Sequence, residues 1–548
     1  MPEQPQILVE PHQVVVGPWP PGCPRCLRTR RVAAAPADRA AEMAVEVPTP
    51  RLPTFLADTV AEIAVAEPSP SRFWIVDKAT LRLSQHGFLP DARCPSCSTM
   101  AGDTAEAAVV PRALRRKLSP ESTRVRALDG DELDSTYVDS QAGLITAVTS
   151  YTHHAFPFTE ATMAVPGVLT EPAGYGRTRD FSSAWSIAVV ESLERLGAYG
   201  PGRRTDVVAG YAEVAADAID PRSLGLYPND RYRTPRFPYR EFTEDAVTRW
   251  VWGYSFGAAR PVLVPESFVY YRMPRTDDVP FAQEISSGCA LGGCYEEAVL
   301  HGLLEIAERD AFLLAWYGAA AVPELDLDTV PDPRVALVAE RIARQGYRVH
   351  IFDTTREHGI PSFWTMAEDV RGGGRPKAMS TGGSGLRPVE AILAALHELC
   401  QTVEYVTLLA GDPQWTERAR RLADHPAEVF SMADHLLCAA NPETFDRYDF
   451  VLADPVRWTW RRARRRWDWP PTLDIGADLA EAVRRFGAAG LDVVAVDMTS
   501  TEHAAGGFRC AKVIAPGAVP MTFGHTVARV TGLARLPAVR NPHPHPFP

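Results

Sequence analysis

The sequence predicts a protein of the mixed α/β (α+β) class, with a small N-terminal domain followed by a much larger one. Three observations support this prediction. The chain has 548 residues, of which 46% are hydrophobic and 23% charged, an ordinary globular balance for roughly two to four domains. Stretches of alternating hydrophobicity, which indicate strands, occur together with long amphipathic helical patterns. Two C-x-x-C pairs near the N-terminus set the first segment apart.

Two cysteine pairs mark the N-terminal domain, which we place at residues 1–120. Cys23 and Cys26 lie in "GCPRCLRTRR", and Cys94 and Cys97 lie in "DARCPSCST". A proline after the first cysteine of each pair favours a tight turn that points two thiolates at one ion. Four reduced surface thiols are the alternative, but the other five cysteines show no such pairing. We predict a structural Zn²⁺ site, because four thiolates leave no open position for chemistry.

The segment between the two cysteine pairs contains a helix and two strands. The apolar spacing predicts a helix near 53–66. The stretch "FWIVDKATLRLSQHGFL" alternates as two strands would, with a turn at "DKAT".

Charge and hydropathy exclude several functional classes. The net charge of −11 leaves no basic excess for binding a nucleic-acid duplex. No apolar run approaches the ~20 residues of a membrane span, and the N-terminus has no charged-then-apolar secretory pattern. We therefore expect a cytoplasmic protein without a nucleic-acid or membrane partner.

Three predicted helices of the larger domain, residues 121–548, carry acidic clusters. The first helix lies within 174–199, the second within 294–312, and the third follows "STGGSG". Their polar residues are Glu191, Glu194 and Arg195 in the first, Glu297, Glu305, Glu308 and Arg309 in the second, and Glu398 and Gln401 in the third. The three glutamates of the second helix fall within roughly 80° of arc. Each helix follows a Gly- or Ser-rich stretch, which we expect to be a loop able to approach a ligand closely.

Clustered carboxylates on one helix are usually a solvated acidic face. Like charges at helical spacing repel, however, unless a positive charge lies between them. The recurrence of this pattern on three helices favours Mg²⁺ ions that bridge nucleotide phosphates. The arginines would neutralise the cluster in the absence of ligand. The chain has no G-x-x-x-x-G-K-[ST] motif and no convincing G-x-G-x-x-G motif.

The blocks "GYGRT…ESLER", "SSGCALGGCYEEAVLHGLLEIAERDAF" and "HELCQ" resemble the three ATP-binding blocks of the YcaO family, over roughly residues 137–548. The resemblance implies a YcaO-type ATP-binding fold in which glutamates hold Mg²⁺. By motif position it assigns ATP and Mg²⁺ binding to Glu191, Glu194, Arg195, Ser186, Ser287, Glu297, Glu305, Glu308, Arg309, Glu398 and Gln401. Two positions depart from the family pattern. Ile187 stands where a serine is frequent, with Ser186 adjacent, and Ser287 stands where asparagine is common.

The resemblance leaves the choice of chemistry to the C-terminal tail. Many members of the family convert Cys, Ser or Thr of ribosomally made peptides into thiazolines or oxazolines, whereas others make thioamides or macroamidines. The tail "NPHPHPFP" favours an extended chain. It is similar to the Pro-x-Pro-x-Pro tail of azoline-forming members, which reaches the active site. A disordered tail is the alternative. We therefore expect a cyclodehydratase whose catalytic residues are Glu305, Glu308 and Pro548, through its carboxylate. His543 and His545 are alternative bases.

Two other functions remain as alternatives. A thioamide-forming enzyme would use the same ATP site with a sulfur donor. A non-catalytic peptide-binding scaffold would retain the fold, but clustered unpaired carboxylates cost stability when no metal is needed.

Expectations about partners also follow from the resemblance. The N-terminal domain is similar to the zinc-bearing remnant of a ThiF-like domain, without its Rossmann portion or a winged-helix segment. This implies a precursor peptide as substrate and a separate leader-peptide-binding ThiF-like partner protein, as in thiopeptide pathways. A flavin-dependent azoline dehydrogenase is a further candidate partner, and a homodimer is a further expectation.

Overall fold

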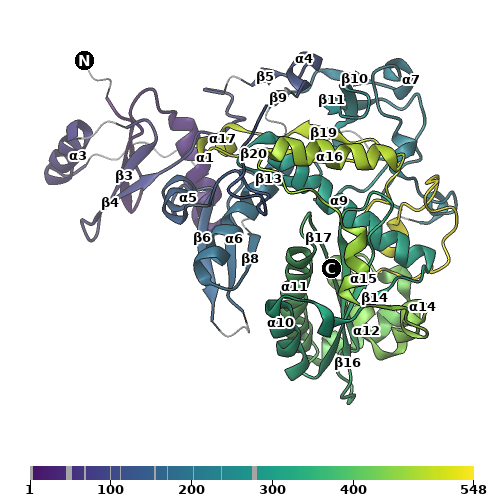
Figure 1. Ribbon diagram of the computed structural model, residues 1–548. Helices are drawn as coiled ribbons and strands as arrows, with labels where there is room; N and C mark the ends of the chain where they lie inside the picture. The colour runs from purple at the N-terminus through teal and green to yellow at the C-terminus, as the bar shows by residue number, and fades with distance from the viewer. Residues whose placement is uncertain are drawn as a thin grey trace.

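The computed structural model describes residues 4–44, 52–66, 69–98, 100–110, 113–152, 156–168, 171–200, 203–235, 237–273 and 280–547. The N-terminal part lies to one side of the larger domain (Figure 1).

An antiparallel four-stranded sheet, in the order β1-β2-β3-β4, forms the centre of the N-terminal part. Its elements are β1 (Ile7–Val9), β2 (Gln13–Val16), β3 (Arg72–Asp77), β4 (Leu83–Gly87), α1 (Pro24–Ala34), α2 (Ala37–Ala44) and α3 (Thr54–Ala66). Successive side chains of a strand point to opposite faces, so Val15 packs with α1 whereas Val14 and Val16 pack with α3. The predicted helix near 53–66 and the predicted pair of strands are both confirmed.

The N-terminal part is joined to the larger domain by buried charges. Arg30 of α1 donates a hydrogen bond to Glu502 of α17 (Thr501–Ala505) at 2.7 Å, and both side chains are buried. Further along the chain, Lys117 forms a buried ion pair with Asp478 at 2.6 Å. The segment around residue 120 thus lies against the larger domain, and the domain boundary placed there stays a prediction.

In its described residues, the larger domain contains a six-stranded sheet, a five-stranded sheet and a three-stranded antiparallel meander. The first sheet has the order β10-β11-β19-β20-β13 with β12 also paired to β11, the second the order β17-β16-β15-β14-β18, and the meander the order β6-β7-β8. The bounds are β6 (Ile145–Tyr151), β7 (Phe158–Met163), β8 (Glu171–Arg177), β10 (Val207–Ala209), β11 (Thr248–Ser255), β12 (Arg260–Pro265), β13 (Cys289–Gly292), β14 (Glu324–Leu325), β15 (Tyr347–Asp353), β16 (Ser362–Asp369), β17 (Ala378–Ser384), β18 (Arg457–Trp458), β19 (Val494–Asp497) and β20 (Arg509–Ile514). A short parallel pair joins β5 (Ala101–Gly102) to β9 (Arg203–Arg204). The predicted mixed class is confirmed.

Three long helices of the larger domain position the candidate site. Helix α6 (Phe181–Leu196) packs on β7 and β8, α9 (Tyr295–Gly318) packs against β13 and β20 on one side and β16 and β17 on the other, and α11 (Pro388–Leu409) covers β16 and β17. The remaining helices are α4 (Ala105–Ala108), α5 (Gly130–Tyr137), α7 (Tyr211–Val214), α8 (Glu266–Val269), α10 (Pro333–Arg344), α12 (Pro413–Asp424), α13 (Met432–Ala440), α14 (Asp449–Leu452), α15 (Trp460–Ala463) and α16 (Ile475–Ala488). Because α9 lies between the two sheets (Figure 1), its polar face opens towards α6 and α11.

Most of each glycine-rich stretch before these helices lies in a strand, namely β8, β13 or β17, so the prediction of loops was wrong there. Residues 286–288, before β13, form a turn as predicted. Glycine is required because each helix folds back tightly onto the strand that precedes it. A Cβ on Gly176 would lie 1.7 Å from the carbonyl oxygen of Ala184, and one on Gly383 would lie 2.2 Å from that of Ala391. The glycines therefore serve close strand–helix packing.

Helix α11 is long and apolar enough to cross a membrane by length and composition alone, with 44% of its most apolar window buried. Its apolar side chains, including Ile392, Leu396 and Leu399, pack into the core over the second sheet. This core packing accounts for the apolar composition of the helix.

Candidate active site

The carboxylates of α6 lie beside β8. Glu191 accepts hydrogen bonds from Arg195 Nη2 at 2.6 Å and from the backbone N–H of Tyr175 at 2.7 Å. The guanidinium of Arg195 also lies 5.5 Å from the centre of the Tyr175 ring. Burial, together with the nearby charges of Glu305 and Glu191, raises the pKa of Glu194 well above its ordinary value. The two helices α6 and α9 therefore present their carboxylates to the same space.

Helix α9 contributes two carboxylates and an arginine. Glu305 accepts a hydrogen bond from the backbone N–H of Gly288 at 3.0 Å. Arg309 lies 3.7 Å from Glu305 and 3.6 Å from Glu308, distances too long for good hydrogen bonds. Burial raises the pKa of Glu308 to about 7, with Glu398 and Glu305 adding to the effect and Arg309 opposing it.

Glu398 of α11 completes the cluster, because its charge raises the pKa of both Glu305 and Glu308. Three helices that are far apart in the sequence thus bring together five carboxylates and two arginines, namely Glu191, Glu194, Glu305, Glu308, Glu398, Arg195 and Arg309. The excess of negative charge in this partly buried setting destabilises the protein unless cations balance it. Hard divalent cations bound through carboxylate oxygens fit this donor set.

Glu297 lies in the first turn of α9 and is held by the chain segment that precedes α5. Its carboxylate accepts hydrogen bonds from Arg124 Nη1 and from the backbone N–H of Val125, both at 2.9 Å. Glu297 is only 2% exposed. The charge of Arg124 also opposes the rise in the pKa of Glu194. This arginine therefore links Glu297 to the cluster.

The remaining predicted residues lie around the cluster. The carbonyl of Ser287 accepts a hydrogen bond from Lys512 Nζ at 2.7 Å, next to the N–H that binds Glu305. Gln401 lines a small pocket with Phe158 and Arg177, and its Oε1 atom is buried without a partner in the described part of the chain. Ser186 is buried near Gly130, on a different side of α6 from the carboxylates.

The C-terminal tail is docked, so the alternative of a disordered tail does not hold for residues 541–547. The ring of Phe547 is fully buried and stacks on Phe312 with 3.6 Å between the ring centres. The guanidinium of Arg309 lies 5.7 Å from the centre of the same ring. A Cβ on Gly382 would lie 2.7 Å from Glu308 Oε1 and 2.9 Å from Phe547, so this glycine keeps the ring close to the carboxylate. Pro548 lies outside the described residues.

Two stacked histidines anchor the tail. The rings of His435 and His545 are 4.0 Å apart, and His435 Nδ1–H donates to the carbonyl of His545 at 2.6 Å. His435 Nε2 accepts from the N–H of Gly524, and His545 Nε2–H donates to the carbonyl of Thr522. Burial lowers the pKa of His435 to about 4 and that of His545 well below its ordinary value. The Nε2 atom of His545 is thus engaged, whereas its Nδ1 atom is buried without a hydrogen-bond partner in the described part of the chain. The lowered pKa makes His545 a weak base.

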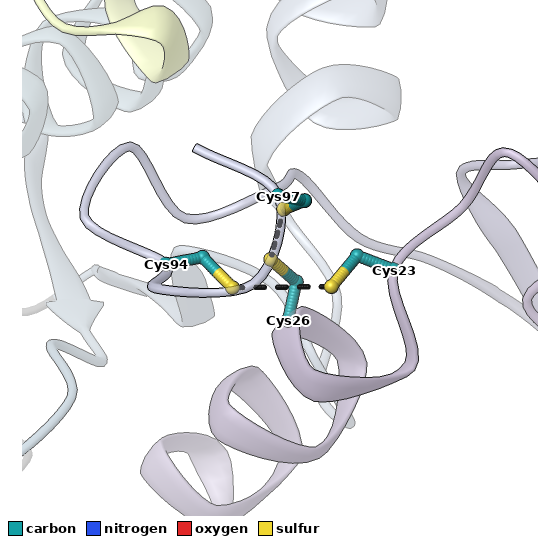
Figure 2. Close-up of side chains that lie close together, drawn as sticks. All are labelled: Cys23, Cys26, Cys94 and Cys97. Carbon is teal, nitrogen blue, oxygen red and sulfur yellow. Dashed lines mark hydrogen bonds between the residues drawn. The ribbon is translucent and has the colours of Figure 1, made fainter. Parts of the chain in front are cut away.

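A second cluster lies in the N-terminal part, where Figure 2 shows four cysteines pointing towards one another. The sulfurs of Cys23, Cys26, Cys94 and Cys97 all lie within 4.8 Å of one another. Cys23 and Cys94 are 3.8 Å apart, and Cys26 and Cys97 are 3.3 Å apart. Tetrahedral zinc with Zn–S bonds of about 2.3 Å requires sulfurs about 3.8 Å apart. Backbone N–H groups of Asp91 and Ser96 point at these sulfurs, as is suitable for thiolates.

Comparison with known proteins decides the family. The sequence model of the YcaO cyclodehydratases, described as ATP- and Mg²⁺-binding, matches residues 174–519, more than half of the chain. The chain belongs to the YcaO cyclodehydratase family. The matched region includes all three carboxylate-bearing helices.

Curated relatives of this YcaO protein match only part of it. An uncharacterized protein from Methanothermobacter thermautotrophicus is 26% identical over 259 residues, covering 47% of this chain and 62% of the relative. A protein in the tfuA 3′ region of Rhizobium leguminosarum bv. trifolii is 32% identical over 148 residues, covering 25% of this chain and 34% of the relative. The matches thus span less than two thirds of either relative.

Solved structures extend the likeness in fold to the N-terminal part. A heterocyclase in complex with substrate and cofactor superposes with a TM-score of 0.75 at 20% identity, covering 99% of this chain and 77% of that one. The heterocyclase TruD gives a TM-score of 0.66 at 21% identity, covering 100% of this chain and 75% of that one. At these identities the comparison establishes the fold alone.

Lys512 and Arg124, which lie beside the carboxylate cluster, were not recognised from the sequence, and Ile187 was noted there only as a departure from the family pattern. Ile187, which replaces the frequent serine, lies one turn before Glu191 and is 39% exposed, consistent with its place on the carboxylate face. Lys512 donates to the carbonyls of Ile285 and Ser287 and is buried. A single lysine inside the apolar strand "CAKVI" could have indicated it, because a buried charge needs a nearby polar partner. Arg124 lies in a segment without any motif.

The histidine anchor of the YcaO tail predicts acid sensitivity. His435 has a folded-state pKa of about 4, below its ordinary value of about 6.5, so the unfolded chain binds more protons between these values. The free energy of unfolding should therefore fall as the pH is lowered from about 6.5 to about 4. Protonation would place a hydrogen on His435 Nε2, which now accepts from Gly524. Chemical denaturation across this range should show a shallower dependence for His435→Gln, whereas the exposed His12→Gln should keep the wild-type slope. Equal slopes in all three proteins would contradict the prediction.

Proposed function

We propose that this protein is an ATP-dependent cyclodehydratase that converts Cys residues, with Ser and Thr as further targets, of a ribosomally made precursor peptide into thiazolines or oxazolines. The observation that carries this proposal is the docked tail. Residues 541–547 reach Phe312 and Arg309, beside the carboxylate cluster. A proline-alternating tail at this place is the feature that the resemblance associates with azoline-forming members.

The carboxylates and arginines supply positioning and charge balance in this proposal. Glu191, Glu194, Glu305, Glu308 and Glu398 would hold the Mg²⁺ that accompanies ATP. When bound, ATP with Mg²⁺ supplies the phosphoryl group that turns the former amide oxygen into a leaving group. The substrate thiol adds to the preceding carbonyl carbon with loss of its proton, and the resulting oxyanion would take the γ-phosphoryl group with release of ADP. The oxygen then leaves as phosphate while the amide nitrogen loses its proton, which forms the C=N bond of the azoline. Arg309, now balanced by Glu305 and Glu308, is placed to contact phosphate oxygens once cations neutralise these carboxylates.

Mass spectrometry tests the reaction. A cysteine-rich candidate precursor peptide is incubated with the protein, its candidate leader-binding partner, ATP and Mg²⁺, and ADP release is followed in parallel. The proposal requires a loss of about 18 Da, the mass of water, for each residue modified through phosphoryl activation. A gain of about 16 Da would indicate thioamide formation by the same activation, and the absence of ATP turnover with all partners present would favour a scaffold.

We further propose that Cys23, Cys26, Cys94 and Cys97 hold a structural Zn²⁺. Metal analysis of the purified protein should give about one zinc per chain, as one four-cysteine site requires. Cys94→Ser should remove the metal and lower the melting temperature, because metal-binding free energy contributes to folding. Cys400→Ser, a change at a buried cysteine outside the cluster, should keep the zinc. Full zinc content in Cys94→Ser would refute the site.

Partners and location belong to the same proposal. The solved heterocyclase in complex with substrate and cofactor has this fold, and we propose that the substrate of this protein is a peptide. We propose that a separate ThiF-like protein delivers the leader peptide, that Pro548 takes part in catalysis, and that the reaction takes place in the cytoplasm.

A further inference from the structure

The short helix α17 lies between the cysteine cluster and α6. Its residue Glu502 accepts hydrogen bonds from the backbone N–H of Ala92 at 3.0 Å and from Arg30 Nη2 at 2.7 Å. Ala92 belongs to residues 89–98, the loop that carries the second cysteine pair and is called the knuckle loop below. Glu502 is 5% exposed. The knuckle loop is therefore fixed to α17 by a buried carboxylate.

The next residue of α17, His503, binds the end of α6. Its Nε2–H donates to the carbonyl of Leu193 at 2.8 Å, and its Nδ1 atom accepts from the N–H of Ser500 at 2.9 Å. The contact with Ser500 selects the tautomer, because a neutral imidazole carries its proton on one of its two nitrogens. The side chain is fully buried, and burial lowers the pKa of His503 below its ordinary value. His503 is thus a neutral donor to α6.

This contact caps the helix. The last four carbonyls of a helix have no partner within the helix, and Leu193 is one of them in α6. A buried carbonyl without a partner is costly, so the donor on His503 stabilises the last turn of α6 in its observed place.

A second contact reaches the same end of α6 directly from the knuckle loop. Arg93, which adjoins Cys94, donates from Nη1 to the carbonyl of Tyr199 at 2.8 Å. Tyr199 ends the 3₁₀ turn η1 (Gly197–Tyr199), which follows α6 without a break. A cavity of about 20 Å³, with room for about one water molecule, lies between Arg93, Tyr199 and Glu502. The knuckle loop, α17 and the end of α6 thus form one junction.

The last turns of α6 carry residues of the candidate active site. Glu194 and Arg195 follow Leu193 directly, and Glu191 precedes it by one half-turn. The charge of Glu305, on α9, acts on Glu194, so the two helices face each other here. Mg²⁺ takes oxygen ligands at about 2.0–2.1 Å in nearly ideal octahedral geometry, and it tolerates little displacement of one helix from the other.

We infer that His503 and Arg93 are positioning residues for the ATP site, and that they couple Zn²⁺ binding at the cysteine cluster to Mg²⁺-ATP binding at the carboxylate cluster. When Zn²⁺ is bound, the thiolates of Cys94 and Cys97 hold the knuckle loop, which holds the end of α6 through these two residues. The inference rests on the proposed function in taking the four cysteines as a Zn²⁺ site and the carboxylates as the ATP site. By thermodynamic linkage, each ligand then raises the affinity for the other by the same factor.

Equilibrium competition with a zinc-selective fluorescent chelator tests the coupling on the full-length, zinc-loaded protein. Mg²⁺ with a non-hydrolysable ATP analogue should raise the affinity for zinc at least about fivefold. Removal of the zinc should weaken binding of the analogue, measured by calorimetry, by the same factor. A parallel titration with Mg²⁺ and no nucleotide corrects for Mg²⁺ taken up by the chelator. An unchanged zinc affinity in a protein that binds both ligands would overturn the coupling.

A matched pair of variants separates positioning from packing. His503→Gln retains a donor for Leu193 at the place of Nε2, whereas His503→Asn retains an acceptor for Ser500 near the place of Nδ1. Each variant loses one buried hydrogen bond, so both should melt lower than wild type by a similar amount. His503→Asn should weaken binding of the Mg²⁺-ATP analogue at least about fivefold, and His503→Gln should bind it nearly as well as wild type. Equal analogue affinities in the two variants would overturn the positioning role of His503.

Arg93→Ala tests the second contact without disturbing the core, because the side chain of Arg93 is 37% exposed. The variant should weaken binding of the analogue and reduce the effect of the analogue on zinc affinity. Arg25→Ala, at an exposed arginine beside Cys26, should do neither. Wild-type behaviour of Arg93→Ala in both measurements would overturn the positioning role of Arg93.

Failure of the proposed function gives different results from failure of this inference. A purified protein without zinc would refute the Zn²⁺ site and the coupling together. A zinc-bearing protein that does not bind the Mg²⁺-ATP analogue would refute the ATP site. A protein that binds both ligands independently, with His503→Asn at wild-type affinity for the analogue, would overturn this inference alone.

Discussion

Replacing Glu305 with glutamine should abolish ATP-dependent modification of the peptide, with a loss of at least about 100-fold in turnover. Glutamine keeps an acceptor for the N–H of Gly288 but removes the negative charge that would hold a cation between α6, α9 and α11. Without nucleotide the variant should melt no lower than wild type, because one of several mutually repelling, partly buried carboxylates is gone. ADP release, peptide mass and melting temperature with and without Mg²⁺-ATP measure these effects.

A loss of turnover without a fall in the melting temperature of the nucleotide-free protein identifies a ligand site. Glu417→Gln is the matched control, because Glu417 is 71% exposed on α12, a helix that carries none of the cluster residues. It should leave turnover and the ATP-induced stabilisation unchanged. A Glu305→Gln protein that melts much lower than wild type in the absence of nucleotide would instead assign Glu305 to the stability of the fold.

Truncating Phe547 to alanine should destabilise the protein by about 3–5 kcal/mol, the usual cost of removing a buried aromatic ring. The ring stacks on Phe312 and lies beside Arg309, so its loss also frees the tail next to Glu308. Turnover should fall by at least about tenfold even at temperatures where the variant is fully folded, because Arg309 loses its contact with the aromatic ring. Urea denaturation and single-turnover ADP formation provide the two readouts.

Controls for the tail separate packing from catalysis. Phe430→Ala removes a phenylalanine that is 63% exposed and should change the free energy of unfolding by no more than about 0.5 kcal/mol. Phe547→Leu should recover part of the stability. A Phe547→Ala protein with wild-type turnover would show that the tail stabilises the fold without taking part in the reaction.

The sequence predicted the helices of the candidate site well, because their signal is local. The spacing of Glu305, Glu308 and Arg309 on one face follows directly from helical geometry, and their partners on α6 and α11 repeat the same pattern. The proximity of Glu398 to Glu308 could not be obtained in this way, because it depends on how α9 is placed between two sheets. The repeated pattern indicated a shared Mg²⁺ site, and the family resemblance supported the prediction that the three helices meet.

The glycine-rich stretches were misjudged for an instructive reason. Glycine lowers the local preference for a strand, so "STGGSG" has the composition of a loop. The strand is stabilised instead by its neighbour β16 and by a helix that approaches within contact of Gly383. Lys512 was missed for a related reason, since two of its partners are backbone carbonyls and the third, Glu284, lies 228 residues away in the sequence without any motif.

The buried pair of Arg30 and Glu502 restricts which N-terminal segments of relatives can replace the one in this protein. Glu502 also accepts the N–H of Ala92, so it serves the N-terminal part through two contacts. A chimera that brings an N-terminal segment without an arginine at position 30 would leave this carboxylate buried without its counter-charge, at a cost of about 3–5 kcal/mol. The two parts of the chain are therefore expected to be inherited together, and grafted segments should be chosen as matched pairs across this contact.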